Sequence, residues 1–281
     1  MMVSLPAKWI KKFNLKKGDE VYVEEFDKGL IIKTDSSLVN SNKAIIDVTG
    51  FNPLINRVLI SFYIKGIDEL EVKFSDAKEI SDFQKRVINE LIGFEIIKQT
   101  NSSFIIKDIA SVDNQNIDEV VNRIFLILDS MAEELVNSIS KKQDLKPIID
   151  MDSSINKFVN FCLRILNKKG YIRFDKTLQM YSIVSLLEEI GDLYKKISLE
   201  LQKNKNLANN DVVSMIRELK EFLHLYHRLL FNFNKKEAVV FANKYEVIKK
   251  KLKQKNTVDI YLFQILETII RMNNHLLVVS F

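Results

Sequence analysis

Glycine and proline, the residues that most often interrupt regular structure, are unevenly distributed in this chain. Five of the seven glycines and two of the three prolines lie at or before Gly93, and the only later ones are Pro147, Gly170 and Gly191. Because these residues mark turns and helix ends, the pattern predicts strands and turns in the first third and long helices in the remainder. We therefore expect a mainly α fold preceded by a small β-rich region.

The composition is that of a folded protein without secretion or membrane signals. Hydrophobic residues make up 47% of the 281 residues, enough to build the cores of two or three domains, and the net charge is +5. The N-terminal residues lack the apolar run of a signal peptide, and no apolar stretch is long enough to cross a bilayer. We expect a soluble cytoplasmic protein, free or peripheral at the inner membrane face, with no membrane insertion.

Residues 1–34 form the first predicted unit, a small β-rich head. The segment Val3–Leu5 predicts a short apolar strand, and Pro6 then opens a helical turn, where its missing N–H costs nothing. From Val21 to Lys33 the sequence alternates through a strand, a turn at Asp27–Gly29 and a second strand.

A polar linker at 35–43 separates this head from a mixed region at 44–110. The apolar patterns in 44–110 predict the order helix, strand, helix, strand, strand. We interpret this region as a small α+β module joining the head to the helical part.

From residue 117 onward the apolar residues recur at spacings of three and four, the pattern of amphipathic helices. We expect six helices, the first from 117 and the others at about 152–168, 174–203, 211–233, 236–254 and 257–279. They form two sets of three, 117–203 and 211–281, each with a long, a shorter and a long helix. This arrangement predicts a six-helix bundle made by duplication of a three-helix unit.

The head resembles a known domain. The segment VSLPAKWIKKFNLKKGDEVYVEEFDKGLIIK at 3–33 resembles the AbrB/SpoVT swapped-hairpin domain, with Pro6, Leu15, Gly18, Asp19 and Val21 at the positions of that pattern. In such domains two chains interleave their hairpins because so small a unit cannot bury its own apolar face. The resemblance implies a homodimer.

The remainder resembles the PhoU family of phosphate-uptake regulators. Leu187-Glu188-Glu189-Ile190-Gly191-Asp192 is similar to the family signature LERIGD, and Asp152-Ser153-Ser154-Ile155-Asn156 is similar to its DxxID motif. The segments YIKGIDELEV at 63–72 and LIGFEII at 91–97 resemble the module that joins an AbrB-like head to PhoU repeats in archaeal members. The resemblance implies an adaptor for a phosphate ABC transporter or a sensor kinase.

Four oxygen-bearing side chains are candidate metal ligands: Glu188 and Asp192, four residues apart on one helix face, and Asp152 and Asn156 on the preceding helix. If these helices are antiparallel, the four converge and could hold a divalent Mg, Mn, Fe, Zn or Ca ion. Members of the PhoU family bind metal at paired acidic motifs, so the resemblance points the same way. The alternative is solvated carboxylates paired with Lys195 and Lys196, without any metal.

The second repeat is a poorer candidate. Alignment with the family places Tyr245, Lys249 and Arg271 where acidic ligands belong, and only Glu267 remains. Because cationic groups repel a metal ion, we expect at most one site per chain, with Lys249 and Arg271 neutralising Glu267.

A competing function is transcription regulation through the head, with Lys8, Lys11, Lys12, Lys16 and Lys17 contacting DNA. The head has seven lysines against five acidic residues, a net charge of +2, which is small for neutralising phosphates. A third possibility is a head that only dimerises the chain. No phosphate-binding Gly-rich loop or nucleophile elbow is present, so we expect no enzymatic activity.

Overall fold

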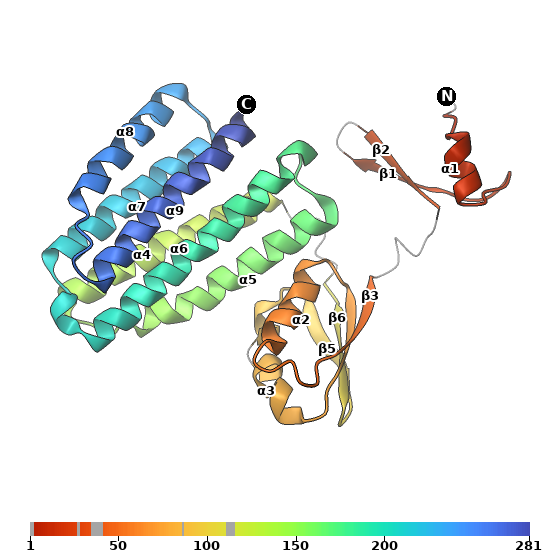
Figure 1. Ribbon diagram of the computed structural model, residues 1–281, viewed down its shortest axis with the longest axis horizontal. Coiled ribbons are helices and arrows are strands. Elements are labelled where there is room, and N and C mark those ends of the chain that lie inside the picture. The colour runs from red at the N-terminus through yellow and green to blue at the C-terminus, as the bar shows by residue number, and fades with distance from the viewer. Residues whose placement is uncertain (1–2, 27–28, 35–41, 86, 111–115) are drawn as a thin grey trace.

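The computed structural model describes residues 3–26, 29–34, 42–85, 87–110 and 116–281. Figure 1 shows three parts in chain order: a small N-terminal head, an α+β module and a six-helix bundle. The mainly α fold class is therefore confirmed. No helix in the described ranges is long and apolar enough to span a bilayer.

The head contains one short helix and one hairpin. Helix α1 spans Ala7–Lys12, and strands β1 (Tyr22–Phe26) and β2 (Gly29–Lys33) pair antiparallel. The predicted strand at Val3–Leu5 is wrong for the single chain, because a strand needs a hydrogen-bonded neighbour and none of the described residues pairs with this segment. Of the predicted turn at 27–29, residues 27 and 28 lie outside the described ranges.

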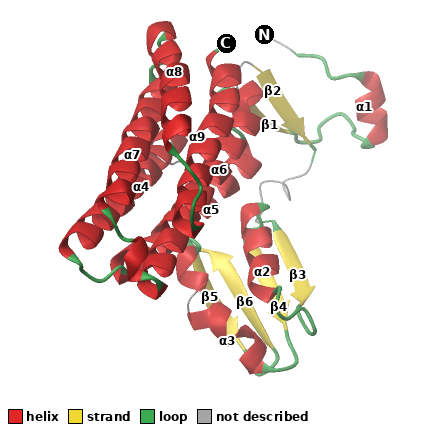
Figure 2. Ribbon diagram, turned by 60° about the vertical axis from the view of Figure 1, so that its left-hand side comes forward, coloured by secondary structure: helices red, strands yellow, loops and turns green. Residues whose placement is uncertain are grey.

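The module is a four-stranded sheet with helices on one face. Its elements are β3 (Lys43–Asp47), α2 (Ile55–Ile64), β4 (Glu69–Lys73), α3 (Ala77–Lys85), a 3₁₀ turn (Val87–Glu90), β5 (Phe94–Gln99) and β6 (Ser103–Asp108). The strand order is β3-β4-β6-β5, with only β3 and β4 parallel. Alternate residues such as Leu70, Val72 and Ile106 are buried beneath α2 and α3, which cover one side of the sheet in Figure 2. The predicted order of elements missed β3.

The bundle contains the six expected helices. They are α4 (Ile117–Lys141), α5 (Lys146–Lys169), α6 (Thr177–Lys203), α7 (Asn210–Phe231), α8 (Lys235–Lys251) and α9 (Thr257–Ser280). Four of these helices begin with an asparagine whose side chain accepts hydrogen bonds from backbone N–H groups of the first turn. These asparagines are Asn116, Asn209, Asn234 and Asn256. Helix α5 begins six residues before the predicted start at 152, with Pro147 in its first turn.

The two predicted repeats share one hydrophobic core. Buried residues from all six helices form a single cluster. Helix α6 packs against its counterpart α9, and α4 packs against its counterpart α7. The bundle is thus organised as two three-helix units facing each other through equivalent helices.

The module is fixed to the bundle through a buried arginine on α5. Arg164 is only 2% exposed and donates to the carbonyl oxygens of Tyr63 (2.9 Å) and Ile67 (2.7 Å). It also contacts the carboxylates of Asp68 (2.5 Å) and Asp108 (3.1 Å). A buried guanidinium needs partners for its fork of N–H donors, and the module supplies four.

Candidate functional site

The acidic motif of the first repeat lies where α5 crosses α6. Gly191 permits this approach, because a Cβ built at that position would lie 3.3 Å from Cγ2 of Ile155 on α5. Gly191 therefore marks a close contact between α6 and α5. The crossing places Asp152 beside the face of α6 that carries Glu188 and Lys195.

Asp152 is the buried centre of this site. It is 3% exposed, and its Oδ2 atom lies 2.6 Å from Nζ of Lys195. The Nδ2 group of Asn156 is 3.5 Å from the same oxygen. Among the described residues, Oδ1 of Asp152 and Oδ1 of Asn156 are buried without a hydrogen-bond partner. The surroundings of Asp152 therefore hold one ion pair, to Lys195, and two buried acceptor oxygens without a protein partner in the described part of the chain.

The other two predicted ligands add negative charge to the same region. Burial raises the pKa of Glu188, and the neighbouring Asp192, Asp152 and Glu189 carboxylates raise it further, while Lys195 acts in the opposite direction. These carboxylates of α5 and α6 are therefore close enough for their charges to influence one another.

As arranged, this cluster does not fit a divalent ion. The Lys195 ammonium already contacts the buried Asp152 carboxylate and neutralises its charge. Within the described ranges, no group of three or more His, Cys, Asp or Glu side chains is positioned to hold a metal. Lys195 is the cation of this site. From the sequence, Lys195 is expected beside the carboxylates only in the alternative without a metal.

The equivalent region of the second repeat is also neutralised by the chain itself. Glu267 accepts a hydrogen bond from the Tyr245 hydroxyl (2.8 Å), which in turn accepts one from Lys249 (2.8 Å). Nζ of Lys249 lies 3.9 Å from Glu267. Lys249 therefore has the neutralising position predicted for it.

The predicted ion pair between Arg271 and Glu267 is wrong. Arg271 contacts Glu189 of the first repeat at 2.6 Å, not Glu267. Glu189 also accepts a hydrogen bond from the buried Thr268 hydroxyl at 3.2 Å. The reason is geometric: α9 packs on α6, so a side chain on this face of α9 meets α6. The sequence could not reveal this pairing, which joins residues 82 positions apart.

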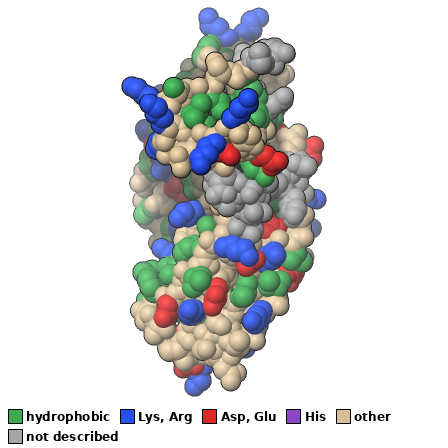
Figure 3. Space-filling model, turned by 90° about the vertical axis from the view of Figure 1, so that its right-hand side faces the viewer, with side chains coloured by type: hydrophobic (Ala, Val, Ile, Leu, Met, Phe, Trp, Pro, Cys, Tyr) green, Lys and Arg blue, Asp and Glu red, His purple; other side chains and the backbone are tan. Residues whose placement is uncertain are grey.

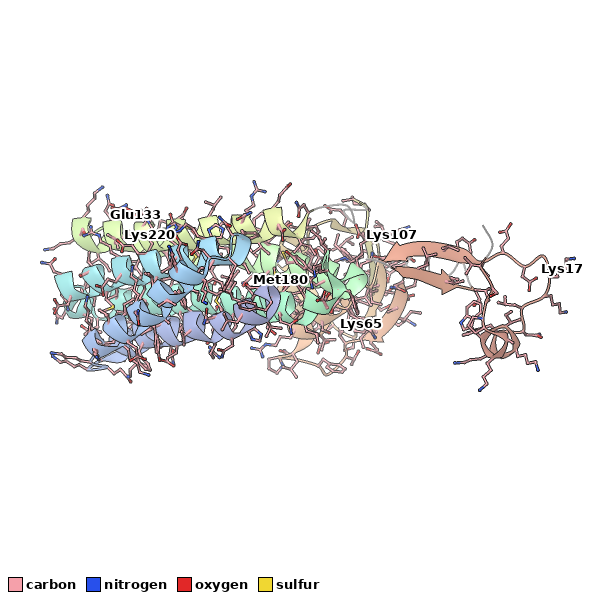
Figure 4. All side chains as sticks on the ribbon, turned by 90° about the horizontal axis from the view of Figure 1, so that it is seen from above. Lys17, Lys65, Lys107, Glu133, Met180 and Lys220 are labelled. Carbon is pink, nitrogen blue, oxygen red and sulfur yellow. The ribbon has the colours of Figure 1, made fainter. Side chains whose placement is uncertain are left out.

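Two histidines of α7, His224 and His227, lie at the contact between α4 and α7 that joins the repeats. His224 pairs with Asp129, and His227 contacts Asn122 at 2.6 Å. Burial, followed by the proximity of His224, lowers the pKa of His227. Lys220 and Glu133, labelled in Figure 4, add an ion pair of 2.6 Å along the same contact. These groups fasten α4 to α7.

The five predicted nucleic-acid-binding lysines lie together in the head. Lys8, Lys11 and Lys12 belong to α1, and Lys16 and Lys17 to the turn after it; all are exposed. The turn is held by Asp19, whose carboxylate accepts the N–H of Lys16 at 2.6 Å. Figure 3, which shows one face of the molecule, has basic and apolar side chains interspersed. The five head lysines are exposed and therefore accessible to a partner.

None of the described head side chains is buried. Apolar side chains that would form a core are instead exposed: Val3 by 67%, Val23 by 57%, Leu30 by 55% and Phe13 by 46%. A unit of this size that leaves its apolar side chains in water needs a partner surface to cover them.

Comparison with known proteins agrees with this description of the head. Residues 2–38 match the family model described as antidote-toxin recognition MazE, bacterial antitoxin. No curated protein and no solved structure matches the chain. The N-terminal head is therefore similar to a MazE/AbrB-type domain. The interpretation of the helical bundle rests on its geometry and on the motifs described above.

Proposed function

We propose that this protein is a non-enzymatic, homodimeric regulator of phosphate uptake, in which the head joins two chains and the bundle contacts a phosphate transporter or its sensor kinase. The proposal starts from the resemblance of the LEEIGD and DSSIN segments to PhoU motifs. The bundle geometry supports it.

The observation that carries the proposal is the internal symmetry of the bundle. When LEEIGD is aligned with Leu266–Arg271, Glu189 corresponds to Thr268, and these two side chains contact each other. Equivalent residues can meet only near a two-fold axis relating the repeats. A duplicated three-helix unit with acidic motifs on its third helix is the arrangement that the PhoU resemblance implies.

We infer that regulation works through the ion pairs between the helices of the bundle. Lys195 neutralises Asp152 in the first repeat, Lys249 lies beside Glu267 in the second, and Arg271 links the repeats through Glu189. These ion pairs join neighbouring helices, so a partner or cation that competes for one of them would alter helix contacts. We infer that the bundle transmits a signal by binding, without chemical turnover.

Phosphate uptake in cells tests the proposal directly. We expect deletion of the gene to uncouple labelled-phosphate uptake from the phosphate supply, with excess uptake in phosphate-rich medium. The wild-type chain should restore control, whereas a chain carrying both Lys195→Glu and Arg271→Glu should not. Unchanged uptake in the deletion strain would reject the assignment to phosphate regulation.

A second candidate is a DNA-binding regulator, favoured by the MazE-type match and by the exposed lysines of α1 and the following turn. The net charge of +2 on residues 1–34 leads us to expect weak binding. A band-shift titration with duplex DNA at several salt concentrations separates the two functions. Sub-micromolar binding at physiological salt, falling steeply with added salt, would favour the DNA-binding candidate.

A further inference from the structure

Strand β3 is an edge of the module sheet, and one row of its backbone groups has no hydrogen-bond partner within the described part of the chain. The N–H of Val48 donates to the carbonyl of Lys73, and the N–H of Glu69 donates to the carbonyl of Asn42. Even-numbered positions along β3 therefore face β4. Since successive residues of a strand direct their backbone groups to opposite sides, those of Lys43, Ile45 and Asp47 face away from the sheet.

The sequence of this edge is complementary to itself. Strand β3 is Lys-Ala-Ile-Ile-Asp. If a second copy lies antiparallel with Ile45 opposite Ile45, Lys43 of each strand lies opposite Asp47 of the other. The three outward-facing residues are then the ones that exchange hydrogen bonds, and oppositely charged side chains pair at both ends. A parallel arrangement would instead place Lys43 beside Lys43.

The side chains of β3 are consistent with such a partner. Ile45 is 64% exposed although it lies in the middle of a strand, and it would be covered by its symmetry mate. Ala44 and Ile46, on the helix-covered face, are only half-buried. Opposite each other in the pair, they would continue the apolar layer across the junction.

The other edge of the sheet lacks these properties. Strand β5 carries an irregularity between Ile96 and Lys98 in its pairing with β6. An irregular edge strand is a common protection against strand addition, whereas β3 has no such interruption. The two edges therefore differ in their capacity to pair.

We propose that β3 pairs antiparallel with β3 of a second copy of this chain, extending the four-stranded sheet across a two-fold axis at Ile45. The pairing rests on the proposed homodimer, because a five-residue strand pair alone is marginally stable. Nine residues separate β2 from β3, a span of at most about 30 Å. Two chains joined at their heads would hold these edges at effective concentrations on the order of millimolar.

Cysteine cross-linking in the full-length chain tests this geometry. A hydrogen-bonded antiparallel pair has Cα atoms about 5.5 Å apart, within the range of a disulfide. We expect Ile45→Cys to form a covalent dimer under mild oxidation at least about tenfold faster than Ile97→Cys, a matched control on edge strand β5 that is 50% exposed. The native Cys162 is fully buried and should not interfere.

Charge reversal in the Ile45→Cys background gives a second measurement. Lys43→Asp should slow cross-linking, because it places like charges opposite each other at both ends of the pair. Adding Asp47→Lys should restore the cross-linking rate, since opposite charges again face each other at both ends of the strand pair. Restoration identifies the antiparallel register, whereas equal slowing in the single and double variants would contradict it.

Light scattering of the same full-length samples separates this proposal from the homodimer itself. A dimer in which Ile45→Cys and Ile97→Cys cross-link at equal rates would overturn the β3 pairing and leave the head dimer standing. A monomer would overturn both. Selective cross-linking of Ile45→Cys within a dimer is the result we expect.

Discussion

At the scale of single residues, Lys195 decides the character of the acidic site. It supplies a positive charge to a carboxylate that is almost fully buried, where a metal was expected. The sequence could identify Asp152, Glu188 and Asp192 by their spacing, and the structure brings them together. It could not show which of two adjacent lysines turns inward, because that depends on how α6 is rotated against α5.

Removal of this lysine should open the site to cations. In Lys195→Met the carboxylates of Asp152, Glu188 and Asp192 lose their internal counter-ion, so their mutual repulsion favours binding of Mn²⁺. We predict that Mn²⁺ raises the melting temperature of this variant more than that of the wild type. The exposed neighbour provides the control, Lys196→Met, which should respond as the wild type does. Equal responses of all three proteins would show that Lys195 does not occupy the cation position.

Glu188 should make stability depend on pH. Its pKa is raised in the folded state, chiefly by burial, so the folded protein binds more protons than the unfolded chain just above the ordinary pKa of about 4.5. The free energy of unfolding should fall as pH rises through this range. With chelator present, we predict that Glu188→Gln unfolds at a higher temperature than the wild type at pH 7, and that this advantage shrinks as the pH falls toward 4. An advantage that does not change with pH would contradict the assignment.

At the scale of elements, the long helices were predictable and the short or distant features were not. Five of the six bundle helices begin within about three residues of their predicted starts, because their apolar periodicity is sustained and asparagine caps mark several of their first turns. Strand β3 was missed because five residues without flanking Gly or Pro give little signal. Arg164 was missed because its partners lie 56 to 101 residues away.

The Asn209 cap gives a direct test at this scale. Its side chain accepts the N–H groups of Asp211 and Val212 at the start of α7. We predict that Asn209→Ala lowers the free energy of unfolding by about 1 kcal/mol. The adjacent Asn210→Ala, which removes no recorded cap bond, should change it by less than about 0.5 kcal/mol. Chemical denaturation monitored by circular dichroism provides both values, and equal losses would contradict the capping assignment.

The buried charge of Arg164 lies at the centre of the junction between module and bundle, where Asn167 and Lys168 add contacts to Ile64 and Asp68. Replacing Arg164 by Met leaves the carboxylates of Asp68 and Asp108 without their shared partner and should destabilise the protein by about 3–5 kcal/mol. Arg217→Met, at an exposed position on α7, should have little effect. Hydrogen exchange should show the loss first in α2 and α5, which meet at this junction. Unchanged protection in both helices would show that Arg164 does not fasten the two parts.

At the scale of the whole molecule, we propose two chains joined by their heads, each carrying a bundle of two equivalent three-helix units. The head was recognisable from its sequence because its turn residues and apolar alternation follow a fixed pattern. We infer the joining of two chains from burial, because apolar side chains such as Val3, Val23 and Leu30 are exposed in the single chain.

Multi-angle light scattering of the full-length protein and of a variant lacking residues 1–41 tests this central claim most directly. The single chain has a mass of 32.7 kDa. We predict twice this mass for the full-length protein and a single-chain mass for the truncated one, with the helical circular-dichroism signal retained. A full-length protein that remains at 32.7 kDa across micromolar concentrations would contradict the account.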